Sequence, residues 1–180
     1  MKIKKADAVG LVVDIQERLF PHIFEHEQLQ ENAVKLIRGL RILDVPLLVT
    51  QQYTKGLGPT IPAIDQALEH YTPVEKLTFS CCGAPGLMES LEQLGRKQVI
   101  LFGIETHVCV LQTTLDLLEQ GYQPVLIEDC VSSRKLNDKL VAVERMRSEG
   151  AIISTYESIL FELSGIAGTD TFKAISKLVK

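Results

Sequence analysis

The feature that most constrains this chain is a series of short aliphatic runs separated by helix-length segments. Most of these runs are continuous in apolar residues, and they span positions 8–13, 45–50, 74–78, 98–103, 124–127 and 151–153. Continuous apolar runs, unlike alternating ones, indicate strands that are buried on both faces, as in a parallel sheet. The chain is therefore predicted to fold around a buried and mainly parallel sheet.

Helical patterns lie between the predicted strands. Apolar residues recur every three or four positions near residues 29–43, 87–94, 108–118 and 136–146, and a glycine follows three of these segments. Such glycines are typical of helix ends. Alternating strands and helices with right-handed crossovers predict an α/β fold, a three-layer α/β/α sandwich with a mainly parallel, Rossmann-like six-stranded sheet. With 180 residues, the chain is expected to form a single domain, residues 1–180.

The composition limits the partners of the protein. A formal net charge of −4 argues against nucleic acid as a partner, because binding it calls for a concentrated basic surface. No stretch approaches the ~20 apolar residues that span a bilayer, and the amino-terminal residues lack a signal-peptide pattern. The four cysteines do not form metal or disulfide spacings. We therefore expect a cytoplasmic protein with reduced thiols that acts on a small-molecule substrate, with neither nucleic acid nor a membrane as partner.

Three reactive residues fall at the ends of predicted strands. Asp14 follows the first run, Lys76 lies in the third, and Cys109 follows the run at 98–103, where a helical pattern begins. Ligands of parallel sheets bind at the carboxyl ends of the strands, so we predict that the three side chains form one active site. Because a helix start offers unpaired N–H groups and the positive end of the helix dipole, the pKa of Cys109 is expected to lie below the reference value of ~8.5.

These residue types suit nucleophilic catalysis. Cys109 would attack a carbonyl, Asp14 would act as the base, Lys76 would stabilise the thiolate, and the backbone N–H of Cys109 would stabilise the oxyanion. Each residue alone has an ordinary explanation, since cysteine is often a small buried hydrophobe and the other two could be turn or surface residues. Their joint placement favours the catalytic interpretation.

At these positions the sequence resembles the isochorismatase-like cysteine hydrolases, a superfamily that includes the nicotinamidases and N-carbamoylsarcosine amidase. The resemblance rests on Val-Val-Asp-Ile-Gln at 12–16, on Glu-Lys-Leu-Thr-Phe-Ser at 75–80, and on Gly-x-x-Thr-x-x-Cys-Val at 103–110. It implies a catalytic triad of Asp14, Lys76 and Cys109 and a cis peptide bond between Ile104 and Glu105. It also implies an oxyanion hole formed by the backbone N–H groups of Glu105 and Cys109, and assembly into a homo-oligomer.

The segment after the second strand narrows the resemblance. Nicotinamidases carry an Asp-x-His metal motif there, whereas this chain has Gln-Gln-Tyr-Thr-Lys-Gly-Leu-Gly at 51–58, so we predict no metal and no cofactor. This loop looks most like that of the isochorismatase domain-containing subgroup. Long loops at the catalytic edge usually shape the substrate pocket. The residues expected to line that pocket are Gln16, Phe20, Gln52, Tyr53 and Phe79.

The function expected from these features is that of a cysteine hydrolase. It would cleave a small amide-type carbon–nitrogen bond through a covalent intermediate on Cys109. One alternative is a catalytically silent, oligomeric ligand-binding or scaffold protein that keeps the fold. Another is a thiol redox sensor that uses Cys81, Cys82 or Cys109.

Overall fold

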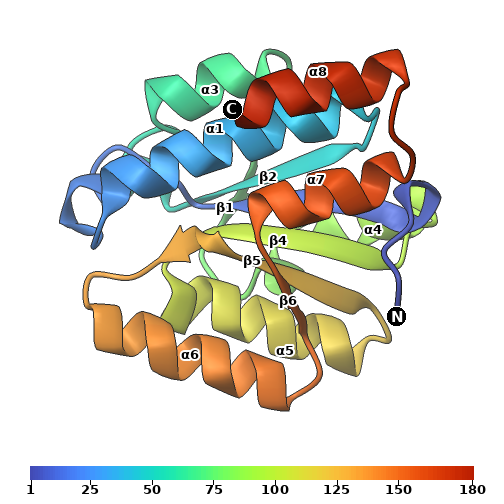
Figure 1. Cartoon of the computed structure of the whole chain (residues 1–180). Helices are drawn as coiled ribbons and strands as arrows, with labels where there is room; N and C mark the ends of the chain where they lie inside the picture. Colours follow the sequence, from blue (N-terminus) through green and yellow to red (C-terminus); the bar gives the residue numbers. More distant parts are fainter.

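The fold is organised around one six-stranded sheet in which every pairing is parallel (Figure 1). The computed structural model describes residues 1–180, and the strands follow the spatial order β3-β2-β1-β4-β5-β6. Their bounds are β1 (Ala8–Val13), β2 (Leu47–Gln52), β3 (Val74–Lys76), β4 (Gln98–Ile104), β5 (Gln123–Ser132) and β6 (Ile152–Ser154). The predicted α/β fold with a six-stranded parallel sheet is confirmed.

Helices cover both faces of the sheet, as Figure 1 shows. On one face α1 packs against the other helices of its layer, which comprises α1 (His26–Ile42), α3 (Pro62–Leu68), α7 (Tyr156–Ser164) and α8 (Asp170–Val179). The opposite layer contains α5 (Leu111–Glu119) and α6 (Leu136–Ser148), which contact each other. Helix α4 (Leu87–Leu94) and α5 both contact the short turn η3 (Cys81–Gly83). The four-residue helix α2 (Thr54–Leu57) lies in the loop after β2.

Most predicted elements agree with the structure to within a few residues. Strand β1 has the predicted bounds, whereas β5 runs on to Ser132 through more polar residues that the apolar pattern did not include. Helices α3 and α7 were not predicted. The first is short and begins at Pro62 directly after a loop rich in glycine and proline, and the second begins after Thr155, whose side chain caps it. The seven residues of α3 are too few for a helical period to become clear.

The core lies on both sides of the two central strands. All residues of β1 and β4 are buried, and their apolar side chains belong to a cluster of 47 buried hydrophobic residues. The two strands approach very closely at Gly103, where φ is +125° and an added Cβ would lie 2.1 Å from the carbonyl oxygen of Val13. Only glycine fits this backbone, because both the conformation and the space exclude a side chain. This contact fixes the end of β1 against the end of β4. No helix combines the length and the apolarity needed to cross a membrane.

Candidate active site

The carboxyl ends of the first three strands bring Asp14 and Lys76 together. Thr50 of β2 pairs with Val13 of β1, and Gln52 of β2 pairs with Lys76 of β3. Asp14 follows β1 directly and adopts a left-handed backbone with φ of +51°. A non-glycine residue in that region is uncommon, although aspartate tolerates it better than most. The chain therefore turns sharply at Asp14 and leaves its carboxylate at the sheet edge.

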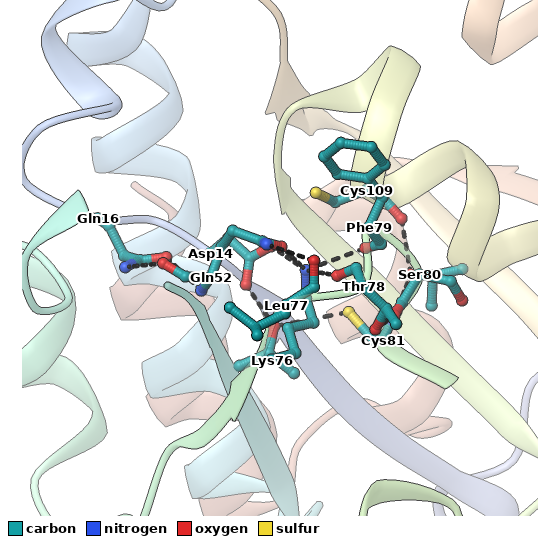
Figure 2. Close-up of polar contacts among 12 residues, drawn as sticks. Asp14, Gln16, Gln52, Lys76, Leu77, Thr78, Phe79, Ser80, Cys81 and Cys109 are labelled. Atoms are coloured by element: carbon teal, nitrogen blue, oxygen red, sulfur yellow. Dashed lines mark hydrogen bonds and ion pairs between the residues drawn. The ribbon is translucent and has the colours of Figure 1, made fainter. Parts of the chain in front are cut away.

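A buried ion pair lies at the centre of the site. The Nζ of Lys76 is 2.6 Å from Oδ2 of Asp14, and the two side chains are 0% and 1% exposed. Lys76 Nζ also donates hydrogen bonds to Gln52 Oε1 at 2.7 Å and to the carbonyl oxygens of Phe79 and Thr78 at 2.9 and 3.1 Å. Figure 2 shows these groups converging on the ammonium. Every acceptor that a buried ammonium needs is thus in place.

The neighbours of Lys76 keep it charged. Burial alone would lower the pKa of Lys76, but the charge of the Asp14 carboxylate raises it, and the net direction is upward. An opposite charge at contact distance favours the charged form. At neutral pH the site therefore holds an ammonium.

Cys109 lies in a π-helical turn, η4 (Thr106–Val110), and not at the start of a regular α-helix. The Val110 N–H donates to the Glu105 carbonyl, five residues back, at 3.2 Å. Such turns are rare and are often found at functional sites. Thr113 Oγ1 donates to the Cys109 carbonyl at 2.6 Å and fixes the turn to α5. The Cys109 residue is 7% exposed, so the thiol is almost removed from solvent.

The expectation of a lowered Cys109 pKa is wrong. Burial, followed by the negative charge of Asp14, raises the pKa of Cys109 to about 12, and the opposing effect of Lys76 is smaller. The local backbone at a helix start favours a thiolate, but desolvation and the remote carboxylate have the larger effect on the Cys109 pKa in the folded protein. At neutral pH Cys109 is therefore a thiol that interacts with a carboxylate and an ammonium.

The peptide bond between Ile104 and Glu105 is cis, as the resemblance implied. The Glu105 N–H donates no hydrogen bond within the protein. The Glu105 carboxylate accepts hydrogen bonds from the backbone N and the Nε of Arg134, both at 3.1 Å. One backbone donor four residues before Cys109 is therefore free to bind another group. The oxyanion role of the Glu105 and Cys109 N–H groups stays a prediction.

A second thiol, Cys81, lies close to the ion pair, and the sequence analysis did not place it in the site. Cys81 is fully buried, and its Sγ is 3.5 Å from Thr50 Oγ1. Burial and the charge of Asp14 raise the pKa of Cys81 to about 12. Its position five residues after Lys76 was the only signal in the sequence. Both Cys81 and Cys109 are protonated in the resting protein at neutral pH.

Two predicted pocket residues, Gln16 and Gln52, bind backbone groups around the site. Gln16 is fully buried, and its amide binds the backbone of Gln52 in both directions and the carbonyl of Gly58, at 2.7 to 2.9 Å. Gln52 accepts from Lys76 and donates to the Leu77 carbonyl at 2.9 Å. These contacts use both amides within the protein. Contact of either residue with substrate stays a prediction.

The other three predicted pocket residues differ in accessibility. Phe20 is buried and packs edge to face against His26, with ring centres 5.1 Å apart. Tyr53 and Phe79 are 49% and 56% exposed, and they flank the β3 segment that carries Lys76. A cavity of about 440 Å³ lies beside Lys76 and is lined by Glu75, Lys76, Leu77, Thr78, Gly83 and Pro85. Neither Tyr53 nor Phe79 lines this cavity, but their exposure leaves them more accessible to a ligand than the buried Phe20.

Two other features, a cavity beside α6 and the histidine two residues before Cys109, take no part in the ion-pair site. A cavity of about 1050 Å³ lies between α6, β6 and α7 and is lined by none of the predicted site residues. His107 is engaged elsewhere, because its Nδ1 lies 2.9 Å from Ser133 Oγ. No three His, Cys, Asp or Glu side chains gather in a way that could hold a metal ion.

Comparison with known proteins agrees with the fold and the sequence pattern. The model of the isochorismatase domain family matches residues 8–158 of the chain. Isochorismatase domain-containing protein 2A of Mus musculus is 40% identical over 182 residues, which cover 99% of this chain and 85% of the mouse protein. The human isochorismatase domain-containing protein 2 is 38% identical, with 99% and 86% of the two chains covered.

Solved structures show the same architecture. The MAR1 ribonuclease of Caenorhabditis elegans superposes with a TM-score of 0.93 at 38% identity, covering 99% of this chain and 92% of that one. The YcaC gene product of Escherichia coli, described as an octameric hydrolase of unknown specificity, superposes with a TM-score of 0.92 at 21% identity, covering 99% and 90%. The second likeness shows the shared fold.

Proposed function

The chain belongs to the isochorismatase domain family, and within it we propose that the protein is a cysteine hydrolase that cleaves a small amide-type carbon–nitrogen bond. The observation that carries this proposal is the buried Lys76–Asp14 ion pair beside the Cys109 thiol. A buried ion pair costs desolvation energy that a packed apolar pair would avoid. Perturbed groups of this kind cluster at catalytic sites.

The first half of the reaction forms the acyl intermediate. As a substrate carbonyl approaches, Asp14 accepts the Cys109 proton and the sulfur attacks the carbonyl carbon. The negative charge that develops on the carbonyl oxygen binds the N–H groups of Glu105 and Cys109. The carbon–nitrogen bond then breaks, Asp14 returns the proton to the leaving nitrogen, and a thioester on Cys109 remains.

The raised pKa of Cys109 is compatible with this scheme, because a base stands beside the thiol and the proton moves only when the substrate is bound. Lys76 keeps its charge throughout and stabilises the thiolate during the transfer. In the second half, Asp14 takes a proton from water, the hydroxide attacks the thioester, and a carboxylic acid leaves while the thiol re-forms. No cofactor takes part in either half.

The alternative is a catalytically silent protein that keeps the fold and binds ligands. The name of the Caenorhabditis elegans relative raises RNA as a further substrate class, but this chain carries a formal net charge of −4, and phosphate backbones call for basic surfaces. Both ideas are tested beside the main proposal.

The test is a substrate screen with matched variants. Purified protein is incubated with small aliphatic and aromatic amides, ureido compounds, nicotinamide and a single-stranded RNA, and ammonia or amine release and RNA length are measured. Cys109→Ala is the blank, and Cys130→Ala, a buried thiol in β5, is the control. Turnover of an amide that disappears only in Cys109→Ala supports the proposal. RNA cleavage that survives Cys109→Ala, or no turnover of any compound, contradicts it.

We also propose that residues 1–180 act as one domain and that the protein forms a homo-oligomer. One continuous apolar core supports the first point, and the octameric description of the Escherichia coli relative supports the second. Analytical ultracentrifugation gives the mass directly, and a monomer at micromolar concentration contradicts the second point. The cytoplasmic location stays a prediction.

A further inference from the structure

Thr50 binds Asp14 in two ways that the sequence analysis did not foresee. This fully buried residue of β2 places its hydroxyl Oγ1 2.8 Å from Asp14 Oδ1, and its carbonyl oxygen accepts the Asp14 N–H at 3.3 Å. The two contacts hold both the backbone and the carboxylate of a residue whose φ is +51°. Thr50 lies opposite Val13 in the sheet, so the rigid pairing of β1 and β2 sets its position.

The direction of the hydroxyl proton follows from its neighbours. A threonine hydroxyl has one proton, and an ionised carboxylate can only accept. The Val12 carbonyl lies 3.5 Å from the same Oγ1, a longer and weaker contact than the 2.8 Å contact with Asp14. Cys81 Sγ is also 3.5 Å away, and its protonated thiol can donate to Oγ1. The chain of contacts therefore runs from Cys81 through Thr50 to Asp14.

This arrangement divides the two carboxylate oxygens between two partners. Oδ1 accepts from Thr50, and Oδ2 lies 2.6 Å from the Lys76 ammonium. The carboxylate plane is fixed from two sides by residues of two different strands. A carboxylate held in this way keeps one orientation and does not have to rotate before it accepts the Cys109 proton.

We propose that Thr50 is a positioning residue for the base Asp14, and that its hydroxyl is needed for Asp14 to accept the Cys109 proton. This inference rests on the proposed function. Thr50 does not touch the reacting atoms, and it acts only through Asp14. The Cys81 Sγ contacts the Thr50 hydroxyl at 3.5 Å, and Figure 2 shows Cys81 in the same part of the site as Lys76.

The test compares Thr50→Ser with Thr50→Ala, because these two variants differ only by the hydroxyl. The readout is kcat and KM at pH 7.5 for an amide that the substrate screen identifies, because turnover, unlike alkylation of a thiolate, requires Asp14 to accept the Cys109 proton. We expect Thr50→Ser to stay within about twofold of the natural protein and Thr50→Ala to be at least about tenfold slower. Thr114→Val is the control, since this buried hydroxyl binds only the Val110 carbonyl, and its rate should not change.

A double-mutant cycle separates positioning from a structural effect. In an Asp14→Asn background the difference in residual single-turnover rate between serine and alanine at position 50 should vanish, because the group that Thr50 acts through has gone. Equal kcat for Thr50→Ser and Thr50→Ala in the natural background, or a difference that persists with Asp14→Asn, would overturn the inference. Thr50→Ala should lower kcat and leave KM unchanged.

The proposed function has a separate readout. Turnover that persists in Cys109→Ala defeats the cysteine mechanism whatever the Thr50 variants show. Turnover that is lost in Cys109→Ala, combined with equal kcat for the two Thr50 variants, defeats only the positioning role. The two failures therefore cannot be confused.

Discussion

Lys76 Nζ and Asp14 Oδ2 lie 2.6 Å apart with neither side chain exposed by more than 1%. The two residues are 62 positions apart in sequence and belong to the ends of β3 and β1, with β2 between them. A pair so buried is costly to break, because removing one partner leaves an uncompensated charge. This relationship, together with the thiol beside it, leads to five measurable expectations.

Loss of the Lys76 charge should destabilise the protein strongly. Lys76→Met leaves the Asp14 carboxylate buried without its counter-ion and should lower the free energy of unfolding by ~3–5 kcal/mol, measured by urea denaturation at pH 7.5. Adding Asp14→Asn should recover part of that loss. Lys139→Met removes the more exposed ion pair with Glu128 and should cost no more than ~1 kcal/mol. Equal losses at the two lysines would contradict the buried pair.

Cys109 should alkylate slowly at neutral pH and faster in alkali. Since burial and Asp14 raise the pKa of Cys109 to about 12, the thiolate fraction keeps rising through the whole range from pH 7 to 10. The rate constant for iodoacetamide, followed at the Cys109 peptide, should therefore rise without a plateau. A plateau below pH 8 would show an activated thiolate and would contradict the geometry described here.

The protein should lose stability in alkali. Burial raises the pKa of Cys81 from 9.0 to about 12, so between these values the unfolded chain releases a proton that the folded protein keeps. The contribution of the protonated Cys81 thiol to the free energy of unfolding is complete below pH 9. It falls as the pH rises toward 12, by ~1.4 kcal/mol per pH unit for each such thiol. Urea denaturation at pH 8, 9 and 10 measures the slope. Cys81→Ala should flatten it, and an unchanged slope in that variant would count against the burial effect.

Gly103 should not accept a side chain. In Gly103→Ala the new Cβ would lie 2.1 Å from the Val13 carbonyl oxygen, and the backbones of β1 and β4 would have to separate beside Asp14. We expect a loss of more than ~4 kcal/mol or no folded protein. Gly86 is the matched control, because it also has a positive φ, +79°, but faces open space. Gly86→Ala should cost only ~1–2 kcal/mol. Similar losses at both positions would mean that conformation alone, and not the clash, is responsible.

Chelation should leave turnover unchanged. The end of β2 and the residue after it carry Gln51, Gln52 and Tyr53 in place of the Asp-x-His motif expected of a nicotinamidase, and amide and phenol groups bind divalent cations poorly by comparison with aspartate and histidine. Turnover is measured before and after dialysis against EDTA, with zinc and magnesium added back. Loss of turnover that returns with one metal would contradict the prediction.

The local pattern of apolar residues was enough to predict the fold and the order of the main elements. Strands buried on both faces leave continuous apolar runs, and helices that cover them leave a period of three to four residues, so β1, β4, α1 and α6 are readable directly. The same logic placed Asp14 and Lys76 at one sheet edge, because parallel strands end on the same side. Short elements such as α3 and the polar end of β5 leave no comparable signal.

The state of each group in the site was decided only by the tertiary structure. The pKa of Cys109 depends on how much water is removed and on which remote charges approach it, and neither quantity is encoded near position 109. The same holds for Thr50, which contacts Asp14 only because β1 and β2 pair in one register. It also holds for Cys81, whose Sγ contacts Thr50. The sequence by itself determined the fold and the chemical types at the sheet edge. Packing alone determined their protonation and their partners, since desolvation and charge act through space and not along the chain.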